Sequence, residues 1–287
     1  MLTKKAGTIL LNLKTNQVGL VLHENEYSFP KGHLEPGETL LECAIRETEE
    51  ETMRSNHLLI NESVYILNYT TPDGEDIESH LYVSIDDGPT NKKIAKKDRE
   101  ILKWVDFENV ENILTYDNLK KLWNQVKSPI YHILENHGNI TPAILTDLSI
   151  CPTCYNKQNN YCVYGDISNK LLFENNEFEC FLVGNPRADG HVAIQSKSHY
   201  KDMMEIPDDL CKSIFVFAKK MMNILKKVYH SESVYLCTMC DGPMNHFHIQ
   251  LIPRYNFEKR GSSNFVKPRK EYIHNTEKIS KIKKMLQ

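Results

Sequence analysis

The chain has 287 residues, of which 40% are hydrophobic and 25% charged, and its formal net charge is -3. This length allows two domains of ordinary size, each with its own core. The composition predicts a globular protein, argues against nucleic-acid binding because there is no basic excess, and offers no apolar run of the roughly 18 residues that span a bilayer. No signal-peptide cleavage pattern follows Met1, so we expect a cytoplasmic protein with no membrane partner.

The first half of the chain predicts a mixed α/β unit. Apolar runs at 7–13 and 17–22 flank Lys14-Thr15-Asn16 and predict a β-hairpin. A helix is expected at 38–53, where apolar residues recur with helical spacing. Further elements are predicted as strands at 62–70, 80–85 and 101–107 and a helix at 117–126, which Ser128-Pro129 should end.

Residues 128–149 contain two prolines and a glycine and are expected to join two units. The second unit is predicted to be α+β, with strands at 171–183, 190–195, 233–238 and 246–252 and a long helix at about 208–229. We therefore predict two domains, at 1–138 and 139–287.

Three acidic residues of the 38–53 helix have metal-binding spacing. Glu47, Glu50 and Glu51 stand at i, i+3 and i+4, which places their carboxylates on one helical face. Hard cations such as Mg²⁺ or Mn²⁺ prefer such oxygen ligands. A solvated acidic helix would show the same three residues, so the spacing alone leaves both interpretations open.

The carboxylates belong to a longer pattern, G-x5-E-x7-R-E-x2-E-E, formed by Gly32, Glu38, Arg46-Glu47 and Glu50-Glu51. This pattern resembles the Nudix box, and the flanking Phe29-Pro30-Lys31-Gly32-His33 is similar to the diadenosine tetraphosphate hydrolase branch of that family. The resemblance implies an α/β/α sandwich in which Glu47, Glu50 and Glu51 hold Mg²⁺ or Mn²⁺. It also implies that Glu38 and Arg46 brace the loop and helix, as structural residues of the box together with Gly32.

Other residues of this half acquire expected roles from the same resemblance. Glu100, next to the predicted strand at 101–107, corresponds to an additional acid that serves as metal ligand or base, so Glu50 and Glu100 are the catalytic candidates. Lys31 is a candidate for a substrate phosphate, and Tyr82 or Tyr116 for stacking on a base, although core packing is the favoured interpretation of each tyrosine.

The end of the box departs from the family pattern, because Met53-Arg54 replaces the usual glycine and apolar residue. A glycine there permits a left-handed helix end, so we expect a different cap, with Asn56 as the candidate.

A second chemical pattern lies near the C-terminus. In His246-Phe247-His248-Ile249-Gln250-Leu251, polar and apolar residues alternate, so in a β-strand both imidazoles and the amide share one face. An imidazole can attack phosphorus and form a covalent nucleotidyl intermediate, and His248 is the best-placed nucleophile. The alternative is a half-exposed polar strand face without chemistry.

This tract, with its trailing Leu251-Ile252-Pro253-Arg254, resembles the histidine triad (HIT) superfamily. Upstream, Asn185-Pro186, Gly190-His191-Val192 and Ser196-Lys197-Ser198-His199 are similar to the preceding strand and turn of that fold. The resemblance implies an α+β domain with an antiparallel sheet, substrate contacts from Asn185 and Arg254, and homodimerisation.

Gln250 stands where the third histidine of the triad is expected. An amide can donate a hydrogen bond to a phosphate oxygen but cannot act as a general acid, so the leaving group must be one that departs without a proton. This form resembles the branch of galactose-1-phosphate uridylyltransferase and dinucleoside tetraphosphate phosphorylase, which implies His248 and Gln250 as catalytic residues and a phosphate compound as acceptor.

Cys151 and Cys154 have the C-x2-C spacing of a structural zinc site. By resemblance to zinc-bearing members of that branch, His199 and His246 would complete the ligand set. A rival four-cysteine site would recruit Cys237 and Cys240, but on one strand these two residues would point to opposite faces.

Together the two patterns predict a bifunctional nucleotide enzyme, with diadenosine polyphosphates as the substrate class that both resemblances imply. Nucleotide sugars or NAD-like cofactors are alternative substrates for the same chemistry. In another interpretation one domain is a non-catalytic nucleotide sensor, for which Met53-Arg54 gives slight support. The basic segment 256–287 would either reach substrate phosphates or be solvated.

Overall fold

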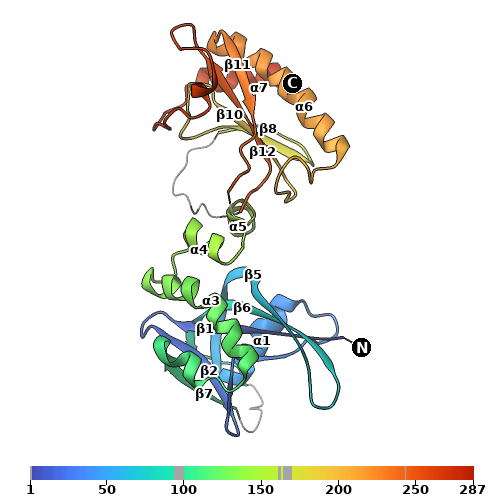
Figure 1. The fold of residues 1–287 in the computed structure, drawn as a ribbon, viewed down its shortest axis with the longest axis vertical. Coiled ribbons are helices and arrows are strands. Elements are labelled where there is room, and N and C mark those ends of the chain that lie inside the picture. Colours follow the sequence, from blue (N-terminus) through green and yellow to red (C-terminus); the bar gives the residue numbers. More distant parts are fainter. Residues whose placement is uncertain (1, 94–99, 161–162, 164–169, 243) are drawn as a thin grey trace. The chain divides into compact units, whose positions relative to one another are not determined.

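The computed structural model describes residues 2–93, 100–160, 163, 170–242 and 244–287 (Figure 1). These residues form two compact units, Met1–Ile150 and Cys151–Gln287. The predicted two-domain mixed architecture is confirmed, and the boundary at 138/139 stays a prediction. Among the described residues, no helix has both the length and the apolar character that a membrane span requires.

The first unit contains a mixed sheet whose main path is β3-β2-β1-β6-β5, with β4 paired to β1 and β7 paired to β2. The predicted hairpin is confirmed, since Leu11 pairs with Val18 and Asn12 with Gln17. β1 and β6 pair in parallel. The strands are β1 (Thr3–Asn12), β2 (Gln17–His23), β3 (Glu26–Ser28), β4 (Lys31–His33), β5 (Arg54–Thr70), β6 (Asp76–Pro89) and β7 (Glu100–Asp106).

The predicted helix of the Nudix-like pattern is α1 (Leu40–Thr52), which packs on β1, β4 and β5. It begins with a capping box, in which the Thr39 side chain accepts from the backbone of Glu42 and the Glu42 side chain accepts from the backbone of Thr39. The expected change of cap is wrong. Met53 itself takes the left-handed conformation, with φ 55° and ψ 30°, and Asn56 instead donates to the carbonyl of Ile45 in α1.

The helix predicted to end before Pro129 continues as α3 (Asp117–Glu135), so that prediction was wrong. A proline inside a helix costs about 3 kcal/mol because it removes a hydrogen bond and crowds the preceding turn. The last turns bury Ile130, Ile133 and Leu134, and burying a side chain of this size is worth about 1.5–3 kcal/mol. Burial of that face therefore outweighs the proline. Short elements near α3 are η1 (Phe107–Asn109), α2 (Val110–Ile113) and α4 (Pro142–Asp147).

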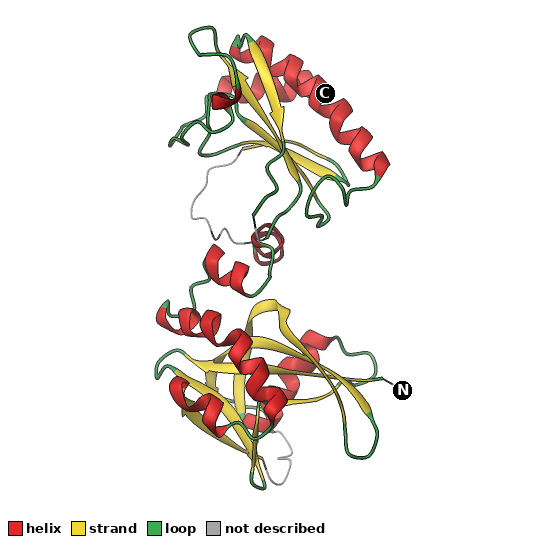
Figure 2. Ribbon diagram, viewed as in Figure 1, coloured by secondary structure: helices red, strands yellow, loops and turns green. Residues whose placement is uncertain are grey.

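The second unit contains a sheet (Figure 2). Its strands are antiparallel and follow the order β11-β12-β10-β9-β8. The predicted strand at 171–183 is two strands, because Asn175 accepts from the backbone of Glu177 and Phe178 and turns the chain. The described elements are α5 (Pro152–Asn159), β8 (Lys170–Glu174), β9 (Phe178–Leu182), β10 (Val192–Ser196), α6 (Asp208–Tyr229), β11 (Ser233–Cys237), β12 (His248–Arg254), η2 (Ser262–Asn264) and α7 (Thr276–Leu286).

The two faces of this sheet have different partners. Ile194, Ile249 and Leu251 point into a core that includes buried residues of α6 and α7. On the opposite face, Ala193 pairs with Gln250 and Gln195 with His248, and all four side chains line a pocket. β12 begins at His248, so the predicted start of this strand at 246 was two residues early.

Candidate functional site

The first site is the carboxylate face of α1. Glu47 and Glu51 are buried and Glu50 is partly exposed. The carboxylate of Glu51 accepts from the backbone N–H of Lys31 at 2.9 Å. Burial raises the pKa of Glu51 to about 8, although the Lys31 ammonium lowers it, and nearby Glu100 raises it further. Buried acids that repel one another in this way are suited to a cation.

Arg46 organises the carboxylates. Its Nε and Nη2 contact the two oxygens of Glu38 at 2.7 and 2.8 Å, and Nη2 also donates to the His33 carbonyl at 2.9 Å. Nη1 lies 2.7 Å from Glu47 and 3.3 Å from Glu50. The guanidinium thus ties the loop at 33–38 to the helix and neutralises part of the acidic face.

Two observations test whether this face fits a divalent cation. Among the described residues, Glu100 Oε2 is buried without a hydrogen-bond partner. A Cβ on Gly32 would lie 2.1 Å from the carboxylate of Glu47, so the backbone passes tightly over the acids. An unsatisfied buried carboxylate oxygen beside a second buried acid fits a hard cation.

The other expected substrate contacts of this half lie in different settings. Lys31 Nζ lies 3.5 Å from Ser28 Oγ, and burial lowers the pKa of Lys31. Tyr82 is buried in a small cluster with Ala6, Cys43 and Ala44, which is a packing position. Tyr116 is 44% exposed, and its hydroxyl donates to Glu26, which raises the pKa of Tyr116 to about 12.

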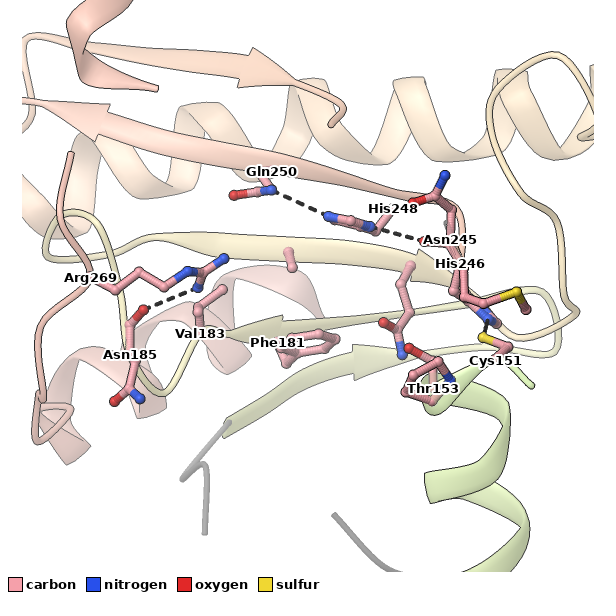
Figure 3. Close-up of a pocket in the computed structure, with 14 residues that line it drawn as sticks. Cys151, Thr153, Phe181, Val183, Asn185, Asn245, His246, His248, Gln250 and Arg269 are labelled. Atoms are coloured by element: carbon pink, nitrogen blue, oxygen red, sulfur yellow. Dashed lines mark hydrogen bonds between the residues drawn. The ribbon is translucent and has the colours of Figure 1, made fainter. Parts of the chain in front are cut away.

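The second site is a pocket of about 470 Å³ on the open face of the second sheet (Figure 3). His246 and Cys151 lie at one end, Asn185 and Arg269 lie at the other, and His248 lies between them. His246 precedes β12, yet it lines the same pocket as His248 and Gln250.

A directed chain of hydrogen bonds fixes the protons of this pocket. The backbone N–H of Arg187 donates to His191 Nδ1 at 3.1 Å, so the proton of a neutral His191 is on Nε2, which donates to Gln250 Oε1 at 3.1 Å. The Gln250 amide then donates to His248 Nε2 at 3.2 Å, and His248 Nδ1 donates to the His246 carbonyl at 3.0 Å.

The end of this chain is a neutral His248 with its lone pair on Nε2, the form that a nucleophile requires. Burial lowers the pKa of His248, and that of the fully buried His191 to about 3, so both imidazoles remain neutral near pH 7.

A cysteine and histidine cluster borders the pocket. The ligand atoms of Cys151, Cys154, His199 and His246 all lie within 4.8 Å of one another. Cys154 Sγ lies 3.4 Å from His199 Nδ1 and 3.5 Å from His246 Nδ1. Cys151 Sγ lies 3.6 Å from His246 Nδ1. Tetrahedral zinc with Zn–S near 2.3 Å and Zn–N near 2.0 Å separates its ligand atoms by about 3.3–3.8 Å, so these distances fit the ion.

His246 is oriented for such a role by its second nitrogen. Nε2 donates to the Ser196 carbonyl at 2.9 Å, which leaves Nδ1 with the lone pair that faces the two sulfur atoms. The expected ligand set is therefore brought together. Cys237 and Cys240 lie outside this cluster, and Cys240 Sγ contacts Thr238 instead.

Family models match both halves of the chain: a NUDIX domain at residues 1–131 and a HIT domain at 165–257. The chain is a fusion of a NUDIX domain and a HIT domain. An uncharacterized HIT-like protein of Methanocaldococcus jannaschii is 33% identical over 98 residues, which cover 32% of this chain and 74% of the relative. The second half therefore belongs to the HIT-like family.

The NUDIX domain has a curated relative in an asymmetrical bis(5'-nucleosyl)-tetraphosphatase of Caenorhabditis elegans. The two are 24% identical over 128 residues, 42% of this chain and 92% of the relative. A solved Ap4A hydrolase binary complex from the same organism aligns with 21% identity and a TM-score of 0.36, over 42% of this chain and 93% of that chain. The two domain families support nucleotide hydrolysis or nucleotide binding.

Two expected substrate residues of the HIT domain differ in their surroundings. Asn185 lines the pocket. Arg254 is buried at the end of β12, where its guanidinium donates to the carbonyls of Tyr255 and Glu258 and pairs with Glu232 at 2.7 Å. A contact between Arg254 and substrate would require these bonds to break.

Sequence reasoning missed the role of His191 and did not single out Arg269 from the basic segment that it expected either to reach substrate phosphates or to be solvated. His191 was quoted only as part of a strand resemblance, and its buried side chain sets the orientation of Gln250. Arg269 belongs to the basic segment at the C-terminus and lines the pocket. A histidine flanked by glycine and valine was a weak signal for the first, whereas nothing in the local sequence singled out Arg269 from its basic neighbours.

Proposed function

We propose that this chain is a bifunctional nucleotide enzyme whose two domains cleave dinucleoside polyphosphates by different chemistry. The NUDIX domain would hydrolyse the polyphosphate chain with a divalent metal, and the HIT domain would transfer a nucleotidyl group to a phosphate acceptor through His248. The observation that carries the proposal is the hydrogen-bond chain from Arg187 to His248, because it leaves a neutral imidazole with its lone pair on Nε2.

In the HIT domain, the Gln250 N–H first releases the lone pair of His248 Nε2. Nε2 then attacks the α-phosphorus of diadenosine tetraphosphate, a P–N bond forms, and the P–O bond to ATP breaks. Inorganic phosphate then attacks the adenylyl group, the P–N bond breaks, and ADP leaves. ATP departs without a proton from the enzyme, which is consistent with an amide at Gln250 in place of an acid. His248 Nδ1 keeps its bond to the His246 carbonyl and so stabilises the charge that develops on the ring.

In the NUDIX domain, water would be the nucleophile in place of a histidine. Glu47, Glu50, Glu51 and Glu100 would hold Mg²⁺ or Mn²⁺, which supplies charge neutralisation for the phosphates and activation of water. Glu50 is the most accessible of the three helical acids, so it is the favoured base, with Glu100 as the second candidate. Hydrolysis of diadenosine tetraphosphate then yields ATP and AMP, which agrees with the asymmetrical activity named for the nematode relative.

Zinc is the favoured occupant of the site at Cys151, Cys154, His199 and His246, where it would fix the segment that precedes β12. Metal analysis of the full chain should find about one zinc, and Cys151→Ser should lose it. A full chain that retains zinc after Cys151→Ser, or that holds none before it, would exclude this assignment. Homodimerisation and a cytoplasmic location stay predictions.

The product pattern tests the two activities. With diadenosine tetraphosphate, Mg²⁺ and phosphate, the wild type should release AMP from hydrolysis and ADP from phosphorolysis. Glu50→Gln should remove most of the AMP, and His248→Ala should remove the ADP. Detection of an adenylyl adduct on the wild type, absent from His248→Ala, would support the covalent step, while phosphate-dependent ADP from His248→Ala would contradict it.

A further inference from the structure

The segment 265–275 follows the HIT domain match, which ends at residue 257, and we call it the C-terminal arm. It runs along the loop at 183–187. The backbone N–H of Lys270 donates to the Pro186 carbonyl at 3.2 Å, and buried His274 donates from Nε2 to the Val183 carbonyl at 2.8 Å. After the arm, α7 buries Ile282 in the core of the domain. The arm is therefore anchored in its middle and at its C-terminal end.

The anchored arm carries Arg269 to the pocket. Its guanidinium donates to the Asn185 carbonyl at 3.2 Å, and Figure 3 shows it at the end of the pocket remote from Cys151 and His246. Arg187 lies nearby and donates from Nη1 to the Lys267 carbonyl. Desolvation lowers the pKa of Arg269, and repulsion by Arg187 lowers it further.

These two guanidiniums have no carboxylate partner among the described residues, and the buried Nε of Arg187 has no hydrogen-bond acceptor there. The nearby acids are paired with lysines instead: Glu258 with Lys267 at 2.6 Å and Asp189 with Lys278 at 2.9 Å. Two adjacent cations beside a pocket, held by carbonyl groups and left without an anion, form a site for an anionic ligand.

The chemistry of the pocket indicates which part of the substrate the two arginines would contact. In-line displacement by His248 expels the leaving group on the side of phosphorus opposite the imidazole. The acceptor that later breaks the P–N bond must attack from that same side. One anion-binding site can therefore serve the leaving polyphosphate in the first step and the attacking phosphate in the second.

We propose that Arg269, supported by Arg187, forms the subsite that binds the phosphate oxygens of the leaving and attacking groups in the HIT domain. This inference rests on the proposed nucleotidyl transfer. It gives the chain beyond the HIT domain a part in acceptor choice, because an arm-borne arginine favours phosphate over water. Arg269 is a specificity-determining residue in this scheme.

The test separates acceptor binding from the reaction of His248. The adenylyl enzyme is formed with diadenosine tetraphosphate, separated from substrate and chased with increasing inorganic phosphate, for wild type, Arg269→Gln and Lys270→Gln. Lys270 is the control, since it is the next residue on the arm, exposed and equally charged. Arg269→Gln should raise the phosphate concentration for half-maximal ADP release at least tenfold and leave the loss of adenylate to water unchanged.

An unaltered phosphate dependence in Arg269→Gln, an equal shift in Lys270→Gln, or an equal loss of the water reaction would each overturn the proposal. If the wild type forms no adenylyl enzyme, the proposed transfer fails and the subsite is tested by calorimetric titration with pyrophosphate without added divalent cation. Binding at least tenfold weaker in Arg269→Gln than in wild type and Lys270→Gln supports the subsite. Equal binding, or no binding by wild type, refutes it.

Discussion

The buried imidazole of His191 donates from Nε2 to the side-chain oxygen of Gln250 at 3.1 Å, across 59 residues of sequence. The amide of Gln250 has two possible orientations, and only one of them directs its N–H toward His248. The backbone donor of Arg187 fixes the tautomer of His191, and His191 in turn fixes the amide. His191 is thus a positioning residue for the proposed nucleophile.

His191→Leu should therefore slow adenylation of His248 about 10–100-fold, since a lost buried hydrogen bond costs about 1–3 kcal/mol and each 1.4 kcal/mol is a factor of ten. The readout is the single-turnover rate of adenylyl-enzyme formation. Because His191 acts through Gln250, the double variant His191→Leu with Gln250→Leu should be no slower than Gln250→Leu alone. Additive losses would contradict the relay, and circular dichroism checks that each variant is folded.

The same histidine gives a signed prediction for acid stability. His191 is surrounded by Gln250, His248, Arg187 and Arg269, and burial, with help from Arg269, lowers the pKa of His191 to about 3. The unfolded chain binds a proton near pH 6.5 and the folded chain does not, so stability is full above about pH 7 and falls as the pH drops toward 3.

The loss of stability reaches about 2 kcal/mol at pH 5, at 1.36 kcal/mol per unit. Hydrogen exchange of the β10 and β12 amides measures the local free energy of unfolding at pH 7 and pH 5. Wild type should lose about 2 kcal/mol more than His191→Gln, which cannot titrate. The same pH dependence in both proteins would exclude a neutral buried His191 as the cause.

Gly32 gives a steric prediction for the NUDIX domain. A Cβ there would lie 2.1 Å from the Glu47 carboxylate, whereas one on Gly74 would meet open space although its φ is +86°. Gly32→Ala should reduce Mg²⁺-dependent hydrolysis at least tenfold, because Glu47 must move. Gly74→Ala should cost about 1 kcal/mol of stability through its backbone alone and leave hydrolysis intact. Full activity in Gly32→Ala would remove Glu47 from the proposed metal site.

The sequence was sufficient to predict an element where its functional residues recur at short, regular spacing. The acids of α1 and the alternation at His246 to Gln250 are local patterns. The first predicted α1, and the second predicted β12 except for its start, which lies at His248. The length of a helix was harder to predict. The end of α3 depends on whether burial of its apolar face stabilises the helix by more than Pro129 destabilises it.

Sites assembled from distant residues were predicted only in part. The four candidate zinc ligands were grouped by resemblance, and the structure brings them together. The links from His191 to Gln250 and from Arg269 to the pocket arise from strand register and from the course of the C-terminal arm. No local periodicity or residue propensity in the sequence predicts either of these two contacts.

Met53 permits a last prediction, on the cost of a left-handed helix end without glycine. Its φ is 55°, its N–H donates to the Glu49 carbonyl at 2.9 Å, and its own carbonyl accepts from Thr90 at 3.1 Å, so the cap is fully built. Backbone strain in this conformation destabilises a residue with a Cβ by about 1–2 kcal/mol. The greater conformational entropy of glycine in the unfolded state costs about 0.4–1 kcal/mol of stability.

Met53→Gly and Met53→Ala lose the same side-chain contacts but differ in backbone strain. The Met53→Gly variant should therefore be more stable than Met53→Ala by about 0.5–1 kcal/mol. The measurement is the free energy of unfolding of the NUDIX domain, from hydrogen exchange of the α1 amides. Alanine as stable as glycine would mean that α1 ends without strain. Because the acids of α1 lie upstream of this cap, Mg²⁺-dependent hydrolysis should persist in both variants, which would remove the slight support that Met53 lent to a non-catalytic sensor.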